Sequence, residues 1–180
     1  MKRLATLTLI GVLLAPRFAS ADPQLSTGLT LGGGVSGLRQ TPPFPSFHLG
    51  VRASVLFGHA QDDRMRAGPY VEALTVAFES FEPGAGLEWL LPAITGAPFV
   101  IGAGGHARYS DAGWQPGVHG TLLFGSRSYN HSSIYGVAGG IFVQGRLAFG
   151  DARQGDVLLG LYIDAAILAL PVVLLINAFR

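Results

Sequence analysis

Residues 47–57 read FHLGVRASVLF, and neighbouring positions of this stretch differ in polarity. The odd-numbered positions hold Phe, Leu, Val, Ala, Val and Phe, whereas the even-numbered positions hold His, Gly, Arg, Ser and Leu. Residues 99–109 and 137–149 show the same period of two, with charged residues on one face only. Because successive side chains of a β-strand point to opposite faces, this pattern predicts strands that separate an apolar face from a polar one.

Glycine and proline punctuate the chain between segments of this kind. Eight strands are predicted, over residues 24–37, 47–58, 68–80, 84–91, 99–110, 117–127, 135–150 and 156–169. Turn-forming residues lie between several of them, as in Thr41-Pro42-Pro43, Glu82-Pro83-Gly84 and Asp111-Ala112-Gly113. Glycine also recurs inside the segments, where each one would cost a helix about 1 kcal/mol. The expected fold class is therefore all-β.

Aromatic residues mark both ends of the apolar face. Phe47 and Phe57 are ten residues apart, and so are Phe99 and Tyr109. Ten residues at about 3.3 Å each, tilted by about 40°, cover roughly 25 Å, which is the height of the apolar band of an outer-membrane barrel. We therefore expect these four aromatics at the two membrane interfaces and the apolar face against outer-membrane lipid.

The opposite face carries the polar strand residues, which we expect to line a lumen. They are Arg52, Glu72, Glu88, His106, Arg108, His119, Arg127, Gln144, Arg146 and Asp164. An eight-stranded barrel has room only for side chains or one small ligand, and buried charges need partners. The first expectation is a structural network of ion pairs. The alternative is a polar path that makes the protein a narrow channel or a small-ligand binder.

The composition supports a location away from water. Charged residues make up 13% of the chain, against about 25% in soluble proteins. The chain has no cysteine, which excludes disulfides, thiolate metal sites and cysteine nucleophiles. Beyond residue 21 there are nine basic and eleven acidic residues, so nucleic acid is not an expected partner.

The first 21 residues follow the pattern of a secretory signal peptide. Lys2 and Arg3 precede an apolar run over residues 4–15, and Ala19-Ser20-Ala21 fits a cleavage site. The run is too short to span a bilayer, which takes about 20 apolar residues. Cleavage would leave a mature chain that starts at Asp22.

With this signal, the period-two repeats and the aromatic ends, the chain resembles the small eight-stranded outer-membrane β-barrel proteins of Gram-negative bacteria. The resemblance implies a closed, antiparallel, up-and-down transmembrane barrel over residues 22–170, exported to the outer membrane. Our first hypothesis for the function is a non-enzymatic protein with a structural or surface role, stabilised by ion pairs in its interior. A soluble periplasmic barrel is a further alternative.

The C-terminal stretch allows two interpretations. Residues 157–179 contain one charged residue, Asp164, and Pro171 near the middle. In the first interpretation the last strand ends near Ala169, and residues 171–180 form an apolar tail or the end of that strand. In the second, residues 158–179 form a transmembrane or plugging helix. Gly160, Pro171 and the cost of Asp164 in lipid favour the first.

Two histidines flank a predicted turn on the inward phase. His106 and His119 could lie on neighbouring strands and hold a metal ion, with His48 as a distant third ligand. Two histidines without a placed carboxylate are a weak metal signal, so we expect hydrogen-bonded interior histidines, with no metal and no cofactor.

One segment is slightly similar to outer-membrane lipid A deacylases, which are also eight-stranded and carry a His-x-Ser pair. Here the pair would be His131 and Ser133. Those enzymes use a carboxylate on the following strand to orient the histidine, whereas the following strand here has Gln144 and Gly145. A lipid-modifying hydrolase is therefore the second alternative, and a polar turn is the expectation.

Overall fold

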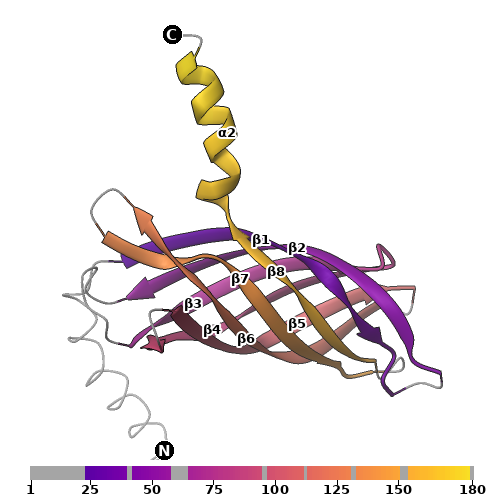
Figure 1. Ribbon diagram of the computed structural model, residues 1–180. Helices are drawn as coiled ribbons and strands as arrows, with labels where there is room; N and C mark the ends of the chain where they lie inside the picture. Colours follow the sequence, from indigo (N-terminus) through magenta and orange to yellow (C-terminus); the bar gives the residue numbers. More distant parts are fainter. Residues whose placement is uncertain are drawn as a thin grey trace, which may run out of the picture.

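The chain forms a closed barrel of eight strands in the computed structural model, which describes residues 23–39, 42–57, 65–94, 97–111, 113–130, 133–150 and 154–178. The strands are β1 (Pro23–Ser36), β2 (Phe44–Phe57), β3 (Arg66–Val76), β4 (Ser80–Ile94), β5 (Ala97–Ser110), β6 (Gly113–Asn130), β7 (Ser133–Ala148) and β8 (Gly155–Asp164). Each strand pairs antiparallel with its neighbour in sequence, and β1 closes the barrel against β8 (Figure 1). The predicted closed, antiparallel, up-and-down fold is confirmed.

Paired residues show how far the strands are staggered. The residues met on one path around the barrel are Pro23, Phe57, Ala67, Trp89, Ile101, Leu122, Val143, Leu159 and, back on β1, Gly33. The path returns ten residues farther along β1, so the barrel has a shear number of ten. Ten residues of about 3.3 Å set against eight strands about 4.8 Å apart give a strand tilt of about 41°.

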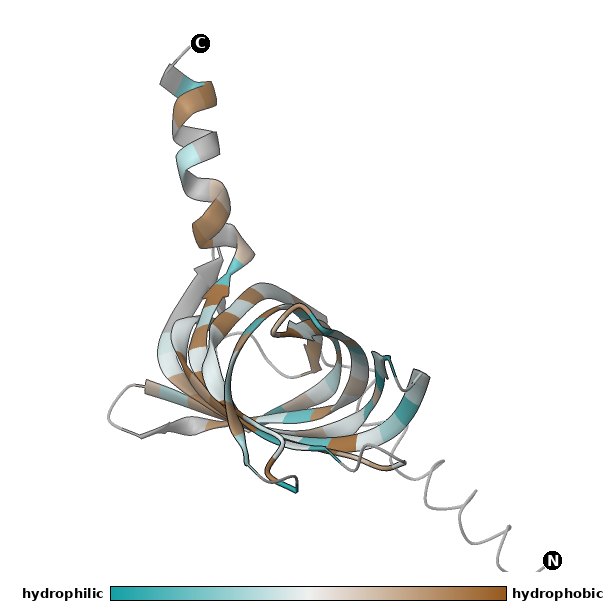
Figure 2. Ribbon diagram, turned by 90° about the vertical axis from the view of Figure 1, so that its right-hand side faces the viewer, coloured by the Kyte–Doolittle hydropathy of each residue, from teal (hydrophilic) through white to brown (hydrophobic). Residues whose placement is uncertain are grey.

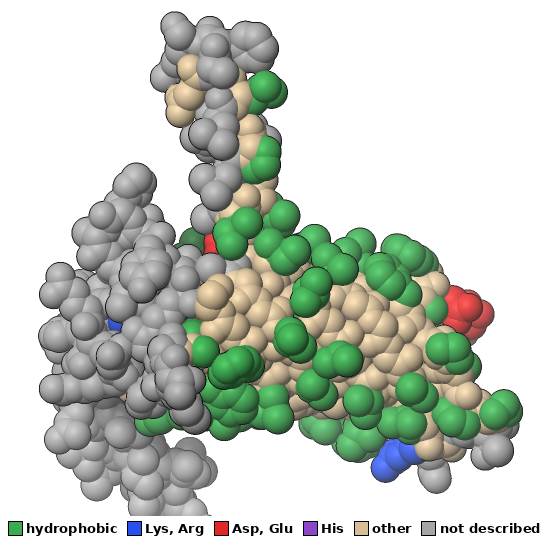
Figure 3. Space-filling view, in the orientation of Figure 1, with side chains coloured by type: hydrophobic (Ala, Val, Ile, Leu, Met, Phe, Trp, Pro, Cys, Tyr) green, Lys and Arg blue, Asp and Glu red, His purple; other side chains and the backbone are tan. Residues whose placement is uncertain are grey.

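The wall separates apolar from polar side chains. Between residues 25 and 163, the outward-facing strand side chains that the structure describes include no Asp, Glu, Lys or Arg. Apolar and polar positions alternate along the strands (Figure 2). Apolar side chains are spread over the outer wall in Figure 3, whereas the acidic (red) and basic (blue) side chains visible there lie near the ends of the barrel. The wall is thus apolar outside and polar inside.

Facing glycines let the wall bend on its inner side. Gly86 pairs with Gly104, and a Cβ built on Gly104 would lie 2.8 Å from the Cα of Gly86 and 2.3 Å from the carbonyl oxygen of Ala85. Gly32 with Gly160, and Gly125 with Gly140, repeat this close approach on two other seams. The backbones are too close there for any side chain.

We expect Gly104→Ala to destabilise the barrel by about 1–3 kcal/mol, because the clash is with backbone and the strands must move apart. Gly145→Ala is the matched control, since a Cβ at that outward position meets nothing within 4 Å. Reversible denaturant unfolding of the two variants in the same detergent measures the difference. Equal stability of the two variants would contradict the close packing of β4 against β5.

The connection between β3 and β4 corrects the sequence prediction. Glu82-Pro83-Gly84 is not a turn but lies within β4, and the chain reverses at Ala77 and Phe78, whose φ angles are 53° and 59°. The turn is closed by the Glu79 amide, which donates to the Val76 carbonyl at 3.0 Å. Pro83 pairs with Ala73 of β3, and it lies where the pairing of β4 with β5 is interrupted at residues 82 and 83, a position that tolerates a missing N–H.

The end of the chain corrects a second prediction. β8 stops at Asp164, not at Ala169, and residues Ala165–Ala178 form helix α2 in place of a tail. The period-two pattern ends at Asp164, because beyond it no polar residue is available for the lumen face of a strand. The run AAILAL that follows contains good helix formers, and aspartate is a favoured N-cap. Within the described part of the chain, no helix is both long enough and apolar enough to cross a membrane.

Candidate functional site: the barrel lumen

The middle of the lumen holds an arginine between two glutamates. Arg52 of β2 donates to Glu72 of β3 at 3.2 Å and to Glu88 of β4 at 2.7 Å. Its guanidinium also lies 3.6 Å from the ring centroid of Tyr70, a cation–π distance. Three adjacent strands place these side chains because all of them occupy inward positions at matching register, with Arg52 directly opposite Glu72.

Glu72 joins this group to residues from the other side of the barrel. Its carboxylate accepts hydrogen bonds from Arg146 at 2.6 Å and from the Gln144 amide at 3.1 Å. His119 lies 3.3 Å from the same carboxylate, and its Nε2 is 2.5 Å from the Tyr70 hydroxyl. A carboxylate with this many donors is held as an anion in a fixed position.

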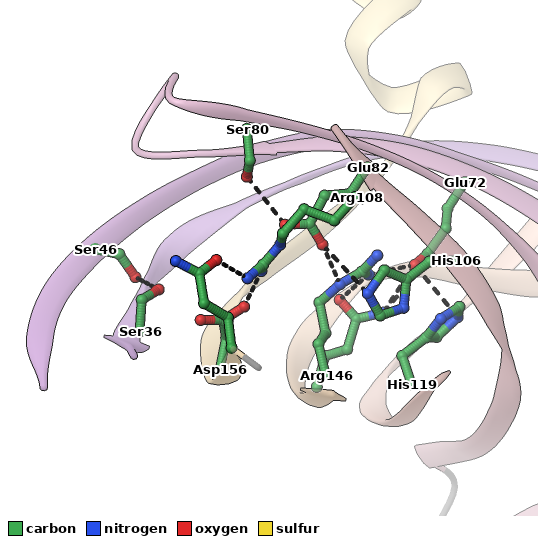
Figure 4. Close-up of polar contacts among 12 residues, drawn as sticks. Ser36, Ser46, Glu72, Ser80, Glu82, His106, Arg108, His119, Arg146 and Asp156 are labelled. Atoms are coloured by element: carbon green, nitrogen blue, oxygen red, sulfur yellow. Dashed lines mark hydrogen bonds and ion pairs between the residues drawn. The ribbon is translucent and has the colours of Figure 1, made fainter. Parts of the chain in front are cut away.

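A second ion-pair group lies toward the end of the barrel that carries the β3–β4 turn, called here the turn end (Figure 4). Glu82 accepts from Arg108 Nε at 2.5 Å and from Arg146 Nε at 2.8 Å. Arg108 also donates to Asp156 and to Gln154. Arg146 therefore bridges Glu72 and Glu82, which makes one continuous network from mid-lumen to the turn end.

Toward the opposite end, where β8 leads into α2 and which is called here the helix end, an apolar cluster lies in the lumen together with buried Arg66, Ser26 and Asp164. The buried cluster there consists of Leu56, Leu90, Val100, Leu123, Phe142 and Tyr162. A cavity of about 30 Å³ lies between this cluster and Arg52, which is room for one or two water molecules. The turn end opens into a mouth of about 560 Å³, on whose lining Arg108 and Asp156 pair with each other.

Nine of the ten predicted lumen residues have buried side chains inside the barrel, from Arg52 at 8% exposure to Arg146 at 1%. The ninth, Asp164, sits 3.5 Å from the Ser26 hydroxyl at the end of β8. The side chain of Arg127, the tenth, lies outside what the structure describes, as do His131 and the side chain of Ser133, which bear on the hydrolase alternative. The predicted signal peptide over residues 1–21 also lies outside the described residues.

Sequence reasoning missed several members of the network. Glu82 was lost because Pro83 and Gly84 placed it in a turn, although the even-numbered phase of β4 assigns it to the lumen beside Glu88. Tyr70 and Asp156 were also missed, although they share the inward even-numbered positions of Glu72 and Asp164, and Gln154 was missed because it lies before β8.

The predicted hydrogen bonding of the interior histidines holds for His119, which contacts the Tyr70 hydroxyl, but is wrong for His106 and His48, whose ring nitrogens have no hydrogen-bond partner among the described residues. The rings of His106 and His119 have centroids 5.6 Å apart, and the two residues pair diagonally, with His106 opposite Gly117. His48 packs instead on Phe142, with ring centroids 5.2 Å apart. Among the residues that the structure describes, no group of three or more histidines and carboxylates is placed to hold a metal ion.

Aromatic residues form a band near each end of the outer wall. The turn-end girdle consists of Phe47, Phe78, Phe81, Tyr109, Trp114 and Phe149, and the helix-end girdle of Phe57, Trp89, Phe99 and Phe124. Phe81, Tyr109 and Trp114 are direct cross-strand neighbours, as are Phe99 and Phe124. The four aromatics predicted from the sequence therefore divide between the two girdles, two in each.

Comparison with models of known protein families gave no match, and no match was found among curated proteins or solved structures. The fold and the site thus define a class by geometry alone. The chain is a closed, eight-stranded, up-and-down β-barrel whose described lumen is filled by ion-paired and apolar side chains.

Proposed function

We propose that this protein is a non-enzymatic outer-membrane β-barrel protein of a Gram-negative bacterium, with a structural or surface role and outer-membrane lipid as its partner. The observation that carries the proposal is the apolar outer wall around a charged lumen. A barrel in water would expose charges and bury apolar side chains, whereas here exposed Val51, Leu122 and Ile141 lie on the same outer face. A closed sheet also pairs each strand with a neighbour on both sides and leaves no free edge, as lipid requires.

The filled lumen supports a structural role in preference to a channel. Arg108 and Arg146 are each held by two carboxylates and are 2% and 1% exposed, so neither can move without leaving a buried charge unpaired. The three-residue connection 77–79 between β3 and β4 leaves little chain for an adhesive loop there. A small ligand in the turn-end mouth is the second candidate function, and the volume of about 560 Å³ favours it.

Fractionation and conductance together test this proposal. We expect the mature protein in the outer-membrane pellet, released only by detergent, and running faster on a gel before boiling than after. The purified protein should add no current steps to a planar lipid bilayer, with a general porin as positive control. Release without detergent would contradict the membrane location, and stepwise currents would favour the channel.

The enzyme alternative has its own test. We expect the acyl pattern of lipid A, measured by mass spectrometry, to be the same with and without the protein. If lipid A loses an acyl chain in the presence of the protein, and keeps that chain with a Ser133→Ala variant, the protein is a lipid-modifying hydrolase.

A further inference from the structure

We propose that α2 lies in the plane of the membrane at the level of the helix-end girdle, among the acyl chains of one leaflet. In this position, acyl chains also fill the groove between α2 and the barrel wall. The inference rests on the proposed membrane location of the barrel. The barrel fold alone does not fix the position of α2, since α2 is not part of the hydrogen-bonded wall.

The direction of α2 is the first observation. The helix leaves the barrel sideways and runs across the barrel axis, as the two views in Figures 1 and 2 agree. A barrel in a membrane has its axis close to the membrane normal, so a helix across that axis lies along the membrane. Its 14 residues would measure about 21 Å, less than the hydrocarbon thickness of about 30 Å.

The level of α2 follows from the strand register. Phe124 pairs with Ile141, which pairs with Leu161, and Asp164 is three residues farther along β8. At the tilt of about 41°, crossing two strands from Phe124 to Leu161 shifts the position about 6 Å along the barrel axis, toward the turn end. Following β8 for three residues from Leu161 to Asp164 shifts it back by about 8 Å. Asp164 therefore lies within about 2 Å of the level of Phe124, in the helix-end girdle, and α2 begins at that level.

The composition of α2 shows what must surround it. The sequence AAILALPVVLLINA holds no charged residue, and Asn177 is its one polar side chain. Exposed side chains lie on all sides of the helix at about 100° per residue, as Ile167, Leu168, Ala169 and Asn177 show. A helix that docked on a protein partner would keep a polar face for water, whereas one that is apolar all round needs apolar surroundings on every side.

A groove continues this apolar surface onto the barrel. It has a volume of about 380 Å³ and runs between Ala165 and Leu168 of α2 and the outer faces of β1, β2 and β3. The outward residues along it include Leu29, Ala53 and Ala73, and the small alanines make the wall hollow there. These groove residues of β1, β2 and β3 lie nearer the middle of the membrane than α2 does, where lipid acyl chains can occupy the groove.

Depth-resolved quenching tests the inference, and the absence of native cysteine makes labelling clean. A fluorophore is attached in turn to Leu168→Cys, Leu175→Cys, Val51→Cys and the loop control Arg39→Cys, in vesicles containing lipids brominated either near the headgroup or at the chain ends. We expect Val51→Cys to lose most fluorescence with chain-end bromines. Leu168→Cys and Leu175→Cys should lose most with bromines near the headgroup, and Arg39→Cys should respond only to aqueous iodide.

The outcomes separate this inference from the proposed function. If Leu175→Cys is quenched by iodide alone, or is shielded from both quenchers by a second copy, while Val51→Cys still senses lipid, the helix is not in the membrane and the inference fails. Maximal quenching of Leu175→Cys by chain-end bromines would contradict the in-plane position. If Val51→Cys does not sense lipid, the proposed function itself fails.

Discussion

Val51→Arg should destabilise the barrel in lipid vesicles by about 2–4 kcal/mol, the cost of an arginine on the lipid face at the bilayer midplane. Val51 lies on the outer face of β2, six residues from Phe57 and four from Phe47, and its side chain is 55% exposed. The position lines the groove beside Leu168 of α2, and it is open enough for an arginine to fit. The whole effect comes from placing a charge in hydrocarbon, and reversible unfolding of the protein folded into vesicles measures it.

Leu25→Arg is the matched control for depth. Leu25 is 61% exposed on the outer face of β1, two residues after the start of that strand, at the level of the helix-end girdle. The same arginine should cost about 0–1 kcal/mol there. If both substitutions change stability by less than about 0.5 kcal/mol, as at an ordinary water-exposed surface, the wall does not face lipid.

Glu72→Gln should destabilise the protein by about 3–5 kcal/mol, the cost of breaking a buried ion pair by removing one partner. Glu72 accepts from Arg52, Arg146 and Gln144, so the neutral amide leaves two buried guanidiniums short of a counter-charge. The substitution keeps the volume of the side chain, so packing changes little. Denaturant unfolding in one detergent gives the difference from wild type.

Two further variants interpret that result. Glu79→Gln removes the same charge from an exposed turn and should change stability by no more than about 0.5 kcal/mol. The double variant Glu72→Gln with Arg146→Gln should cost less than the two single losses added together, since each variant already removes the shared pair. A loss below about 1 kcal/mol for Glu72→Gln would match an exposed pair and would contradict the dry, closed lumen.

The strands could be predicted from the sequence because alternation is a local signal. In β2, β5 and β7 each inward or outward assignment follows from the period of two, and the structure places Phe47, Ile101 and Val143 on the outer face. The β3–β4 turn could not be located, because Ala77 and Phe78 are not typical turn-forming residues, although both adopt positive φ in the three-residue connection 77–79. Pro83 and Gly84 nearby gave a stronger but false turn signal.

A helix was the disfavoured of two interpretations of the C-terminal stretch, because residues that break helices were counted in it although they lie in β8. Gly160 and Asp164 belong to β8, where glycine faces the backbone of Leu31 and aspartate is the last inward residue. Only Pro171 lies inside the helix, at its seventh position. The loss of alternation after Asp164 was the signal that could have ended the strand there.

The lumen could be predicted as a set of residues but not as a network. The alternation along each strand identifies Arg52, Glu72 and Arg146 as residues that face the lumen, one strand at a time. Which arginine meets which carboxylate depends on the stagger of ten residues and on the length of each side chain across the lumen. The pairing of Arg146 with both Glu72 and Glu82 is therefore a property of the assembled barrel and not of any one strand.

A nitroxide scan along residues 47–57 of β2 tests most directly whether the barrel is apolar outside and polar inside in a membrane. Each position is replaced by cysteine, labelled, and its accessibility to oxygen and to a water-soluble nickel chelate is measured in vesicles. The odd-numbered positions should be open to oxygen and closed to nickel, with the strongest contrast at Val51, while even-numbered positions are closed to both. Free access of nickel to the odd-numbered positions would show that water, not lipid, covers the wall.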